Sequence, residues 1–246
     1  MKKRITALLL LLTLSVTSLF ACTSADKSES ASDKTAKTSK STSTKKQELT
    51  PVTLNEVAHS IFYAPMYVAI EKGYFANEGI DLSLVTGFGA DKTMTAVLSG
   101  TADIGFMGSE ASIYTYNEGA NDYVVNFAQL TQRAGNFLVA REDIKDFKWE
   151  DLKGKKVIGG RKGGMPEMVF EYILNQNHID PATDLTIDQN IDFGSTAAAF
   201  AEDKSDYDFT VEFEPGATNL EKQGKGYVVA SLGTDSGYVP YTAFSA

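Results

Sequence analysis

The segments of the chain that could carry out chemistry are mostly short and rich in glycine. The segment 160–164 (Gly-Arg-Lys-Gly-Gly) lacks the Gly-Lys-Ser/Thr ending with which a P-loop holds nucleotide phosphates and magnesium. The segment 87–91 (Gly-Phe-Gly-Ala-Asp) is only half of a dinucleotide-binding fingerprint. The segment 108–111 (Gly-Ser-Glu-Ala) differs from the Gly-x-Ser-x-Gly elbow of hydrolases. None of the three predicts catalysis.

Other polar side chains are suited to holding a ligand. His59 lies where a predicted strand meets a predicted helix, so it either faces a ligand or is a hydrogen-bonded histidine near a hinge. Glu110 and Glu214 lie on similar loops, where a carboxylate either accepts hydrogen bonds from a ligand or caps the local backbone. His178 follows a predicted helix end and is interpreted as a polar residue near the helix dipole.

Four aromatic residues accompany these polar side chains, namely Phe62, Tyr63, Phe88 and Tyr114. Each is either a core residue or an aromatic wall that stacks against a planar ligand.

Alternating strand and helix patterns position these residues. In the first half we predict strands and helices in turn at 51–57, 61–76, 82–85, 91–98, 104–107, 111–118 and 124–128, followed by a crossing strand at 136–140. The second half repeats the plan at 156–158, 165–175, 185–191, 195–202 and 209–213. This order predicts an α/β fold with two similar lobes, each a mostly parallel sheet flanked by helices.

Ligands of such sheets bind at the carboxyl ends of the strands, where helix N-termini present free N–H groups. The predicted loops there are 58–60, 87–90 and 108–110 in the first lobe, and 161–165, 193–195 and 212–215 in the second.

Composition excludes several classes of protein. The 246 residues contain one Cys and two His, too few for a disulfide scaffold or for most zinc sites. From Val52 onward, 14 basic and 28 acidic side chains give a formal net charge of −14, which argues against a nucleic-acid binder. We expect no metal and no cofactor.

The N-terminal segment is typical of an export signal. Lys2, Lys3 and Arg4 precede a Leu-rich stretch that ends in Leu19-Phe20-Ala21-Cys22. That ending resembles a bacterial lipobox, which implies a signal peptide at 1–21 and an acylated Cys22. The alternative is an ordinary signal peptide with an incidental thiol.

Residues 22–51 are predicted to form a tether. After Cys22 they are almost entirely Ser, Thr, Lys, Ala and Asp, with no aromatic residue, so they cannot bury enough surface to fold. The random-coil reach of such a segment is about 30 Å.

Three segments carry a family resemblance: 59–81 (HSIFYAPMYVAIEKGYFANEGID), 98–105 (LSGTADIG) and 151–157 (DLKGKKV). Together they resemble the substrate-binding proteins of ABC importers that serve aliphatic sulfonates, taurine, nitrate and thiamine-pyrimidine precursors. The resemblance implies a type II periplasmic-binding-protein fold that closes on a small molecule and delivers it to a permease and its ATPase. It further implies a monomer on the extracytoplasmic face of the cell membrane, with no catalysis.

The resemblance also implies domain bounds and ligand contacts. Lobe one would span 52–138 and lobe two 139–238, and 239–246 would return to lobe one with the remainder of that lobe missing. The implied contacts are His59, Phe62, Tyr63, Gly87, Phe88, Gly89, Gly108, Ser109, Glu110, Gly163, Gly164 and Met165, to which we add Glu214.

Two other functions stay open. One is a secreted ligand-sensing domain. The other is an enzyme similar to the thiamine-pyrimidine synthases of this fold, which a single Cys and an export signal disfavour. The ligand class also stays open between a heterocycle similar to a thiamine-pyrimidine precursor and an aliphatic sulfonate, with the aromatic and carboxylate residues favouring the heterocycle.

Overall fold

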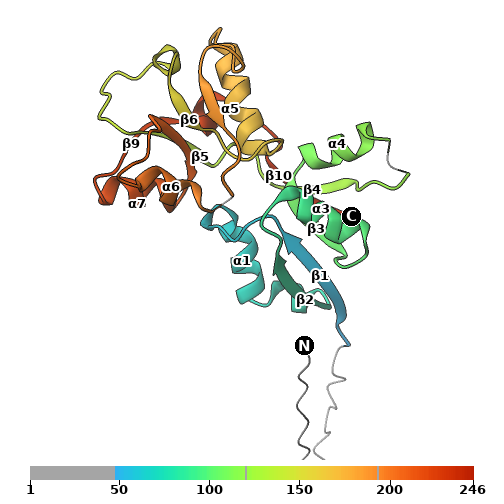
Figure 1. Cartoon of the computed structure of the whole chain (residues 1–246). Helices are drawn as coiled ribbons and strands as arrows, with labels where there is room; N and C mark the ends of the chain where they lie inside the picture. Colours follow the sequence, from blue (N-terminus) through green and yellow to red (C-terminus); the bar gives the residue numbers. More distant parts are fainter. Residues whose placement is uncertain (1–47, 120, 193) are drawn as a thin grey trace, which may run out of the picture. The chain divides into compact units, whose positions relative to one another are not determined.

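The computed structural model describes residues 48–119, 121–192 and 194–246, so the predicted signal peptide, Cys22 and most of the tether lie outside the described residues. Two five-stranded sheets organise this part of the chain, each with its own helices (Figure 1). The predicted α/β fold with two lobes is confirmed. No helix in the described ranges is long and apolar enough to cross a membrane.

The first sheet has the strand order β2-β1-β3-β10-β4. β1 pairs in parallel with β2 and β3, whereas β10 runs antiparallel to both β3 and β4. The bounds of these strands are β1 Thr50–Glu56, β2 Ile80–Thr86, β3 Ile104–Gly108, β4 Asn126–Thr131 and β10 Thr242–Ser245.

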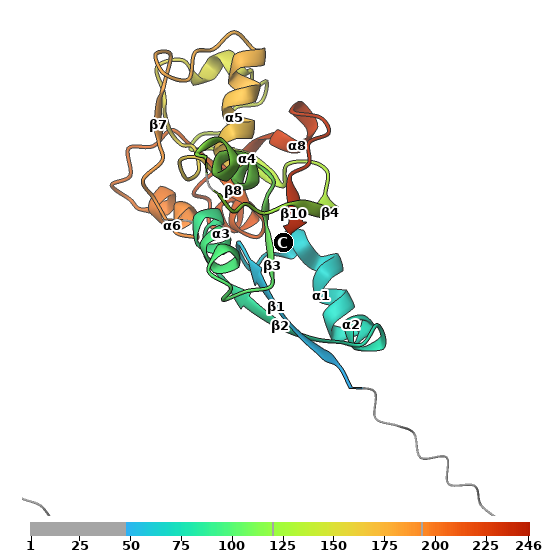
Figure 2. The same cartoon turned by 90° about the vertical axis from the view of Figure 1, so that its right-hand side faces the viewer.

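Helices cover both faces of this sheet because successive strand residues point to opposite sides. Phe106 of β3 packs with Tyr63 and Met66, at the start of helix α1, on one face. The next residue, Met107, packs with Met94 of helix α3 on the other face. Figure 2 shows α1 and α3 on either side of the strands. The helical segments of this lobe are η1 Ile61–Tyr63, α1 Ala64–Glu71, α2 Tyr74–Asn77, α3 Ala90–Leu98 and α4 Glu110–Asn117.

The second sheet repeats this arrangement with the order β7-β6-β8-β5-β9. β6 pairs in parallel with β7 and β8, and β5 runs antiparallel to β8 and β9. The strands are β5 Asn136–Ala140, β6 Lys156–Ile158, β7 Thr186–Asp188, β8 Phe209–Phe213 and β9 Tyr227–Ser231. The helical segments are η2 Trp149–Leu152, α5 Met165–Gln176, α6 Thr196–Ala201, α7 Gly216–Lys222 and α8 Leu232–Asp235.

Each sheet is completed by a strand from the other half of the chain. β5 follows the first-lobe strand β4 directly but lies in the second sheet, and β10 comes after every strand of the second sheet but lies in the first. Two segments therefore cross between the lobes, at 132–135 and 236–241.

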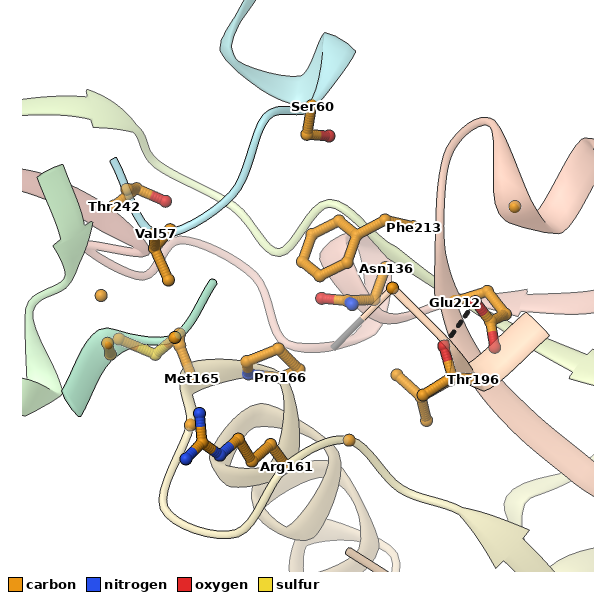
Figure 3. Close-up of a pocket in the computed structure, with 18 of the residues that line it drawn as sticks. Val57, Ser60, Asn136, Arg161, Met165, Pro166, Thr196, Glu212, Phe213 and Thr242 are labelled. Carbon is orange, nitrogen blue, oxygen red and sulfur yellow. Dashed lines mark hydrogen bonds between the residues drawn. The ribbon is translucent and has the colours of Figure 1, made fainter. Parts of the chain in front are cut away.

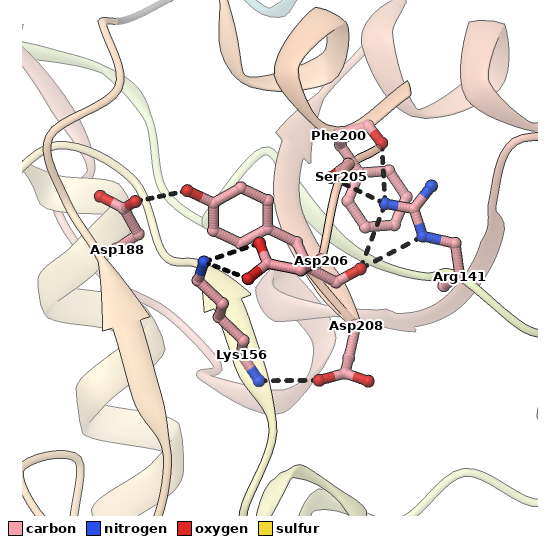
Figure 4. Close-up of polar contacts among 8 residues, drawn as sticks. Arg141, Lys156, Asp188, Phe200, Ser205, Asp206 and Asp208 are labelled. Atoms are coloured by element: carbon pink, nitrogen blue, oxygen red, sulfur yellow. Dashed lines mark hydrogen bonds and ion pairs between the residues drawn. The ribbon is translucent and has the colours of Figure 1, made fainter. Parts of the chain in front are cut away.

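A network at one end of β6 fixes the loop before β8 (Figure 4). Arg141 Nη2 donates to the carbonyl oxygen of Phe200 (2.8 Å) and to Ser205 Oγ (3.0 Å), and its guanidinium lies over the Phe200 ring. Lys156 Nζ pairs with both oxygens of Asp206, at 2.7 and 2.8 Å. This network holds the end of α6 and the start of β8; the start of α6 and the later part of β8 carry residues of the site described below.

Several element bounds differ from prediction. The helix expected at 61–76 is interrupted at Gly73, whose φ of 69° ends α1 before α2 begins. β1 starts at Thr50, two residues before the expected start of lobe one at Val52, because Thr50 pairs with Ile80. The strand expected at 185–191 is limited to 186–188.

Two more strands differ in position from prediction, and three elements were not predicted at all. β4 lies later than predicted, at 126–131, and β10 starts at Thr242 instead of Val239. The element β9 and the helices α7 and α8 were not predicted. His178, with a φ of 58°, is exposed just past the end of α5, as interpreted from the sequence.

Candidate ligand-binding site

A cavity of about 280 Å³ lies at the carboxyl ends of the strands and is lined by both lobes. It is slightly smaller than the typical small-molecule pocket, which encloses about 300–1,000 Å³. Figure 3 shows Val57, Ser60 and Thr242 of the first lobe facing Asn136, Arg161, Met165 and Glu212 of the second.

Glu110 is a buried carboxylate of the cavity wall and the first residue of α4. Its side chain is 2% exposed, and its Oε1 accepts a hydrogen bond from the backbone N–H of Met165 at 3.0 Å. Its Oε2 has no hydrogen-bond partner. Burial raises the pKa of Glu110 to about 7, against smaller lowering effects of the bonds to backbone N–H groups. An unpartnered buried oxygen is costly, so it indicates a position where a ligand donor fits.

Asn136 supplies a hydrogen-bond donor to the cavity wall, where Glu110 supplies an acceptor. It is the first residue of β5, is 1% exposed, and accepts a hydrogen bond at Oδ1 from the hydroxyl of Tyr241. Its Nδ2 has no partner. The buried wall therefore carries an unpartnered acceptor on the first lobe and an unpartnered donor on the second.

Glu212 of β8 is a second buried carboxylate of the cavity. It accepts hydrogen bonds from Thr210 Oγ1 (2.6 Å) and from Thr196 Oγ1 (3.0 Å), the latter drawn in Figure 3. Burial raises its pKa to about 7, which the two hydroxyl donors partly counter. Burial thus raises the pKa of two carboxyls of the cavity, Glu110 and Glu212, to about 7.

His59 is held at the mouth by a buried acid. Glu56, which is 0% exposed, bonds His59 Nδ1 at 2.9 Å, Tyr67 OH at 2.7 Å and Thr86 Oγ1 at 2.9 Å. The His59 ring also stacks on Tyr67 with a centroid distance of 4.4 Å. These contacts fix the orientation of an imidazole whose side chain is 68% exposed.

The positive side chain of the lining, Arg161, is already paired. Its two terminal nitrogens contact the two carboxylate oxygens of Asp91 on α3, each at 2.9 Å, so the ion pair joins the two lobes. Gly89 permits this approach, since a Cβ there would lie 2.3 Å from Arg161 Nη1. The guanidinium charge is therefore compensated by a protein carboxylate.

Eight of the sequence-predicted contacts line the cavity: His59, Tyr63, Gly89, Gly108, Glu110, Gly164, Met165 and Glu214. Tyr63 is buried, which raises its pKa to about 12. The carboxylate of Glu214 accepts hydrogen bonds from the backbone N–H and the hydroxyl of Thr218, so it caps the start of α7. Capping of the local backbone was one of the two alternatives that the sequence left open for Glu214.

Five predicted contacts lie off the cavity. Phe62 packs against Phe213 and Tyr241 between the two crossing segments. Gly87 is required by packing, because a Cβ would lie 2.6 Å from Asn55 Oδ1. Phe88 is 58% exposed, Ser109 donates to the carbonyl of Pro240, and the N–H of Gly163 is taken by Glu167.

Tyr114, the fourth aromatic singled out from the sequence, also lies off the cavity. Its hydroxyl bonds Met168 Sδ at 3.0 Å, which places it in a contact between α4 and α5.

Sequence reasoning missed lining residues that come from the crossing strands. Asn136 was assigned only to the crossing strand 136–140, Tyr241 and Thr242 only to the returning segment 239–246, and Thr196 only to a helix. Arg161 and Glu212 lay on the predicted loops but were not chosen. The signal for Asn136 was available, since a polar residue that opens the apolar strand 136–140 invites a specific hydrogen bond.

Comparison with known proteins shows the family to which this chain is similar over most of its length. Residues 61–234 match the family model described as NMT1/THI5 like. The chain is 56% identical over 203 residues to YtlA of Bacillus subtilis (strain 168), a protein named as a binding protein, covering 82% of this chain and 60% of that protein. The chain therefore spans about three fifths of the length of this relative.

Among the solved structures of similar fold are two periplasmic binding proteins. The periplasmic aliphatic sulphonate binding protein SsuA of Escherichia coli superposes with a TM-score of 0.61 at 20% identity, covering 80% of this chain and 64% of that one. The periplasmic nitrate-binding protein NrtA of Synechocystis PCC 6803 gives 0.61 at 19% identity, covering 80% and 55%. At this identity the likeness shows the periplasmic-binding-protein fold, as expected from the sequence.

Proposed function

The chain belongs to the NMT1/THI5-like family, and from this membership we propose that it is an extracytoplasmic solute-binding protein that delivers a small organic molecule to an ABC importer. The proposed ligand is either a heterocycle similar to a thiamine-pyrimidine precursor or an aliphatic sulfonate. The protein acts as a monomer, without catalysis, and docks on the permease and ATPase subunits. Cys22, acylated, holds it to the outer face of the membrane through the tether.

One observation carries the proposal: the cavity lies between two lobes and both contribute polar groups to it. Glu110 of the first lobe and Asn136 of the second each have an unpartnered polar atom at this wall. A ligand that satisfies both would bridge the lobes, and closure about a ligand is a common motion of two-lobed proteins.

The expected motion turns about the two crossing segments. Phe62 contacts residues near both, and a Cβ at Gly135 would lie 2.6 Å from its ring. Opening would break the contacts that join the lobes, which include Glu110 to Met165 and Arg161 to Asp91.

Relatives support a transport role over an enzymatic one. SsuA and NrtA are named for the sulphonate and the nitrate that they bind, and YtlA is named as a binding protein. A single Cys in the sequence also disfavours an iron-dependent synthase that would use a Cys-rich segment.

A thermal-shift panel tests the proposal. The full chain is heated with aminopyrimidines, thiamine, riboflavin, taurine, alkanesulfonates or nitrate, each well above its expected dissociation constant. A ligand at about 100 times its Kd should stabilise the folded state by about 2.7 kcal/mol. We expect one class to raise the melting temperature, and deletion of the gene to abolish uptake of that solute. A well-folded chain that responds to no member of the panel would refute the proposal.

A further inference from the structure

Two helix N-termini, one from each lobe, meet at the cavity. α4 of the first lobe begins at Glu110, and α5 of the second begins at Met165. The first turn of a helix presents unpaired N–H groups and the positive end of the helix dipole. Such a position is well suited to an anion.

This chain places its own carboxylate there. The Glu110 carboxylate accepts a hydrogen bond at Oε1 from the backbone N–H of Met165, the first residue of α5, at 3.0 Å. A carboxylate from the first residue of α4 thus occupies the first N–H group of α5, and it is 2% exposed.

The Glu110 carboxylate packs closely against the backbone at the end of β3. A Cβ on the neighbouring Gly108 would lie 2.0 Å from Oε2 and 2.5 Å from Oε1. When the carboxyl is ionised, its remaining unpartnered atom, Oε2, is an acceptor, which attracts a donor and repels an anion.

Nothing else in the described lining offers an anion a free positive side chain. Arg161 is paired with Asp91 at 2.9 Å, and Glu212 and Glu214 add two further carboxylates. His59, the other basic group, is bonded to the buried Glu56.

We propose that the Glu110 carboxylate occupies the anion-binding position between the two helix N-termini, so that the cavity excludes sulfonates and other oxyanions and accepts a neutral or cationic solute that donates a hydrogen bond to Oε2. This inference rests on the proposed function and selects between its two ligand classes. Glu110 is thus a specificity-determining residue, and its removal should create an oxyanion site.

The test compares four full-length chains at pH 8, where the Glu110 carboxyl is ionised. They are the wild type, Glu110→Ser, Glu110→Gln and Glu118→Gln, the last on the exposed C-terminal end of the same helix. Serine is chosen because it is well accommodated at a helix start. Isothermal titration calorimetry measures the binding of ethanesulfonate, nitrate and sulfate, and circular dichroism checks that each variant is folded.

The wild type and Glu118→Gln should bind none of the three anions. Glu110→Ser should bind at least one of them more tightly than the wild type by about tenfold or more, which corresponds to about 1.4 kcal/mol. Glu110→Gln, which removes the charge but keeps the shape, should gain less.

Two results would overturn the inference. One is binding of any of the three oxyanions by the wild type itself, which can be read even if both Glu110 variants fail to fold. The other is a folded Glu110→Ser chain without any gain. The first of these leaves the solute-binding function intact, whereas that function itself fails only if the whole thermal-shift panel is silent.

Discussion

The hydroxyl of Tyr241 donates to Oδ1 of Asn136, which ties the residue before β10 to the first residue of β5. Both side chains are almost completely buried, at 2% and 1% exposure. The bond therefore joins the two segments that cross between the lobes, and it orients the Asn136 amide so that Nδ2 faces the cavity wall without a partner.

Tyr241→Phe should destabilise the fold by about 1–3 kcal/mol, because it leaves the buried Oδ1 of Asn136 without its donor. Urea unfolding measures the change. Tyr238→Phe is the matched control, since Tyr238 is 73% exposed and should change the stability by less than about 0.5 kcal/mol. Equal stability of Tyr241→Phe and wild type would show that the bond contributes nothing.

The two buried carboxyls predict a dependence of stability on pH. The pKa of Glu212 is about 7 in the folded state and near the ordinary value of 4.5 when unfolded. The folded state then binds more protons than the unfolded state between these values, so stability falls as pH rises from about 4.5 to 7 and levels off above.

Glu212→Gln should remove part of this decline, because glutamine does not ionise. The measurement is the free energy of unfolding of each protein at pH 5 and at pH 8. The difference between the two pH values should be smaller in Glu212→Gln than in the wild type by about 3 kcal/mol. Glu202→Gln, at the end of α6, is a control. An unchanged pH profile would contradict the burial argument for Glu212.

The ion pair between Asp91 and Arg161 should favour the closed arrangement without contributing much stability. Both side chains are partly exposed, at 59% and 38%, so Asp91→Asn should cost at most about 1 kcal/mol in unfolding. It should increase hydrogen exchange of the backbone at 161–165, where the second lobe meets the first. Glu78→Gln, on an exposed turn of the first lobe, should leave that exchange unchanged.

Gly108→Ala should displace the Glu110 carboxylate, since the added Cβ would lie 2.0 Å from Oε2. We expect loss of ligand affinity by about tenfold or more together with lower stability. Gly100→Ala is the control for a glycine-to-alanine change that strains the backbone without displacing a side chain, because Gly100 has a φ of 72° and an added Cβ there would contact nothing. Gly100→Ala should leave the affinity for the ligand identified by the thermal-shift panel unchanged. An unchanged affinity in Gly108→Ala would refute the role of the Glu110 carboxylate in ligand binding.

His59→Ala should weaken ligand binding several-fold with little effect on folding. Its ring is exposed at the cavity mouth, although it contacts Glu56 and Tyr67. Calorimetry with the panel ligand measures the affinity. His178→Ala, at the exposed end of α5, removes the other histidine and should bind normally.

Prediction from sequence succeeded where local patterns decide the structure. The bounds of the strands at 136–140, 156–158 and 209–213 are confirmed, because short, largely apolar runs between turns define them. The strand β9 was missed although it is similarly apolar. The helices α7 and α8 on either side of it were not predicted, so no helical pattern marked its two ends.

The candidate site was predicted only in part for a different reason. Glu110, Met165 and His59 lie at strand–helix loops, which topology places at the cavity. Asn136, Tyr241 and Thr242 reach the cavity because β5 and β10 change sheets. The crossings at 136–140 and 239–246 were expected, but the residues that they bring to the cavity were not, because the strands that pair with β5 and β10 are distant in the sequence.

The exchange of strands between the sheets also sets the order in which the protein can assemble. β10 lies between β3 and β4, so before residues 242–245 are available β4 has no neighbour in the first sheet. Pairing across so many intervening residues is slow, because the chain must close a long loop before it gains the contacts. During synthesis or export from the N-terminus, the second sheet can therefore finish first, and the earliest part of the domain to emerge is the last to be completed.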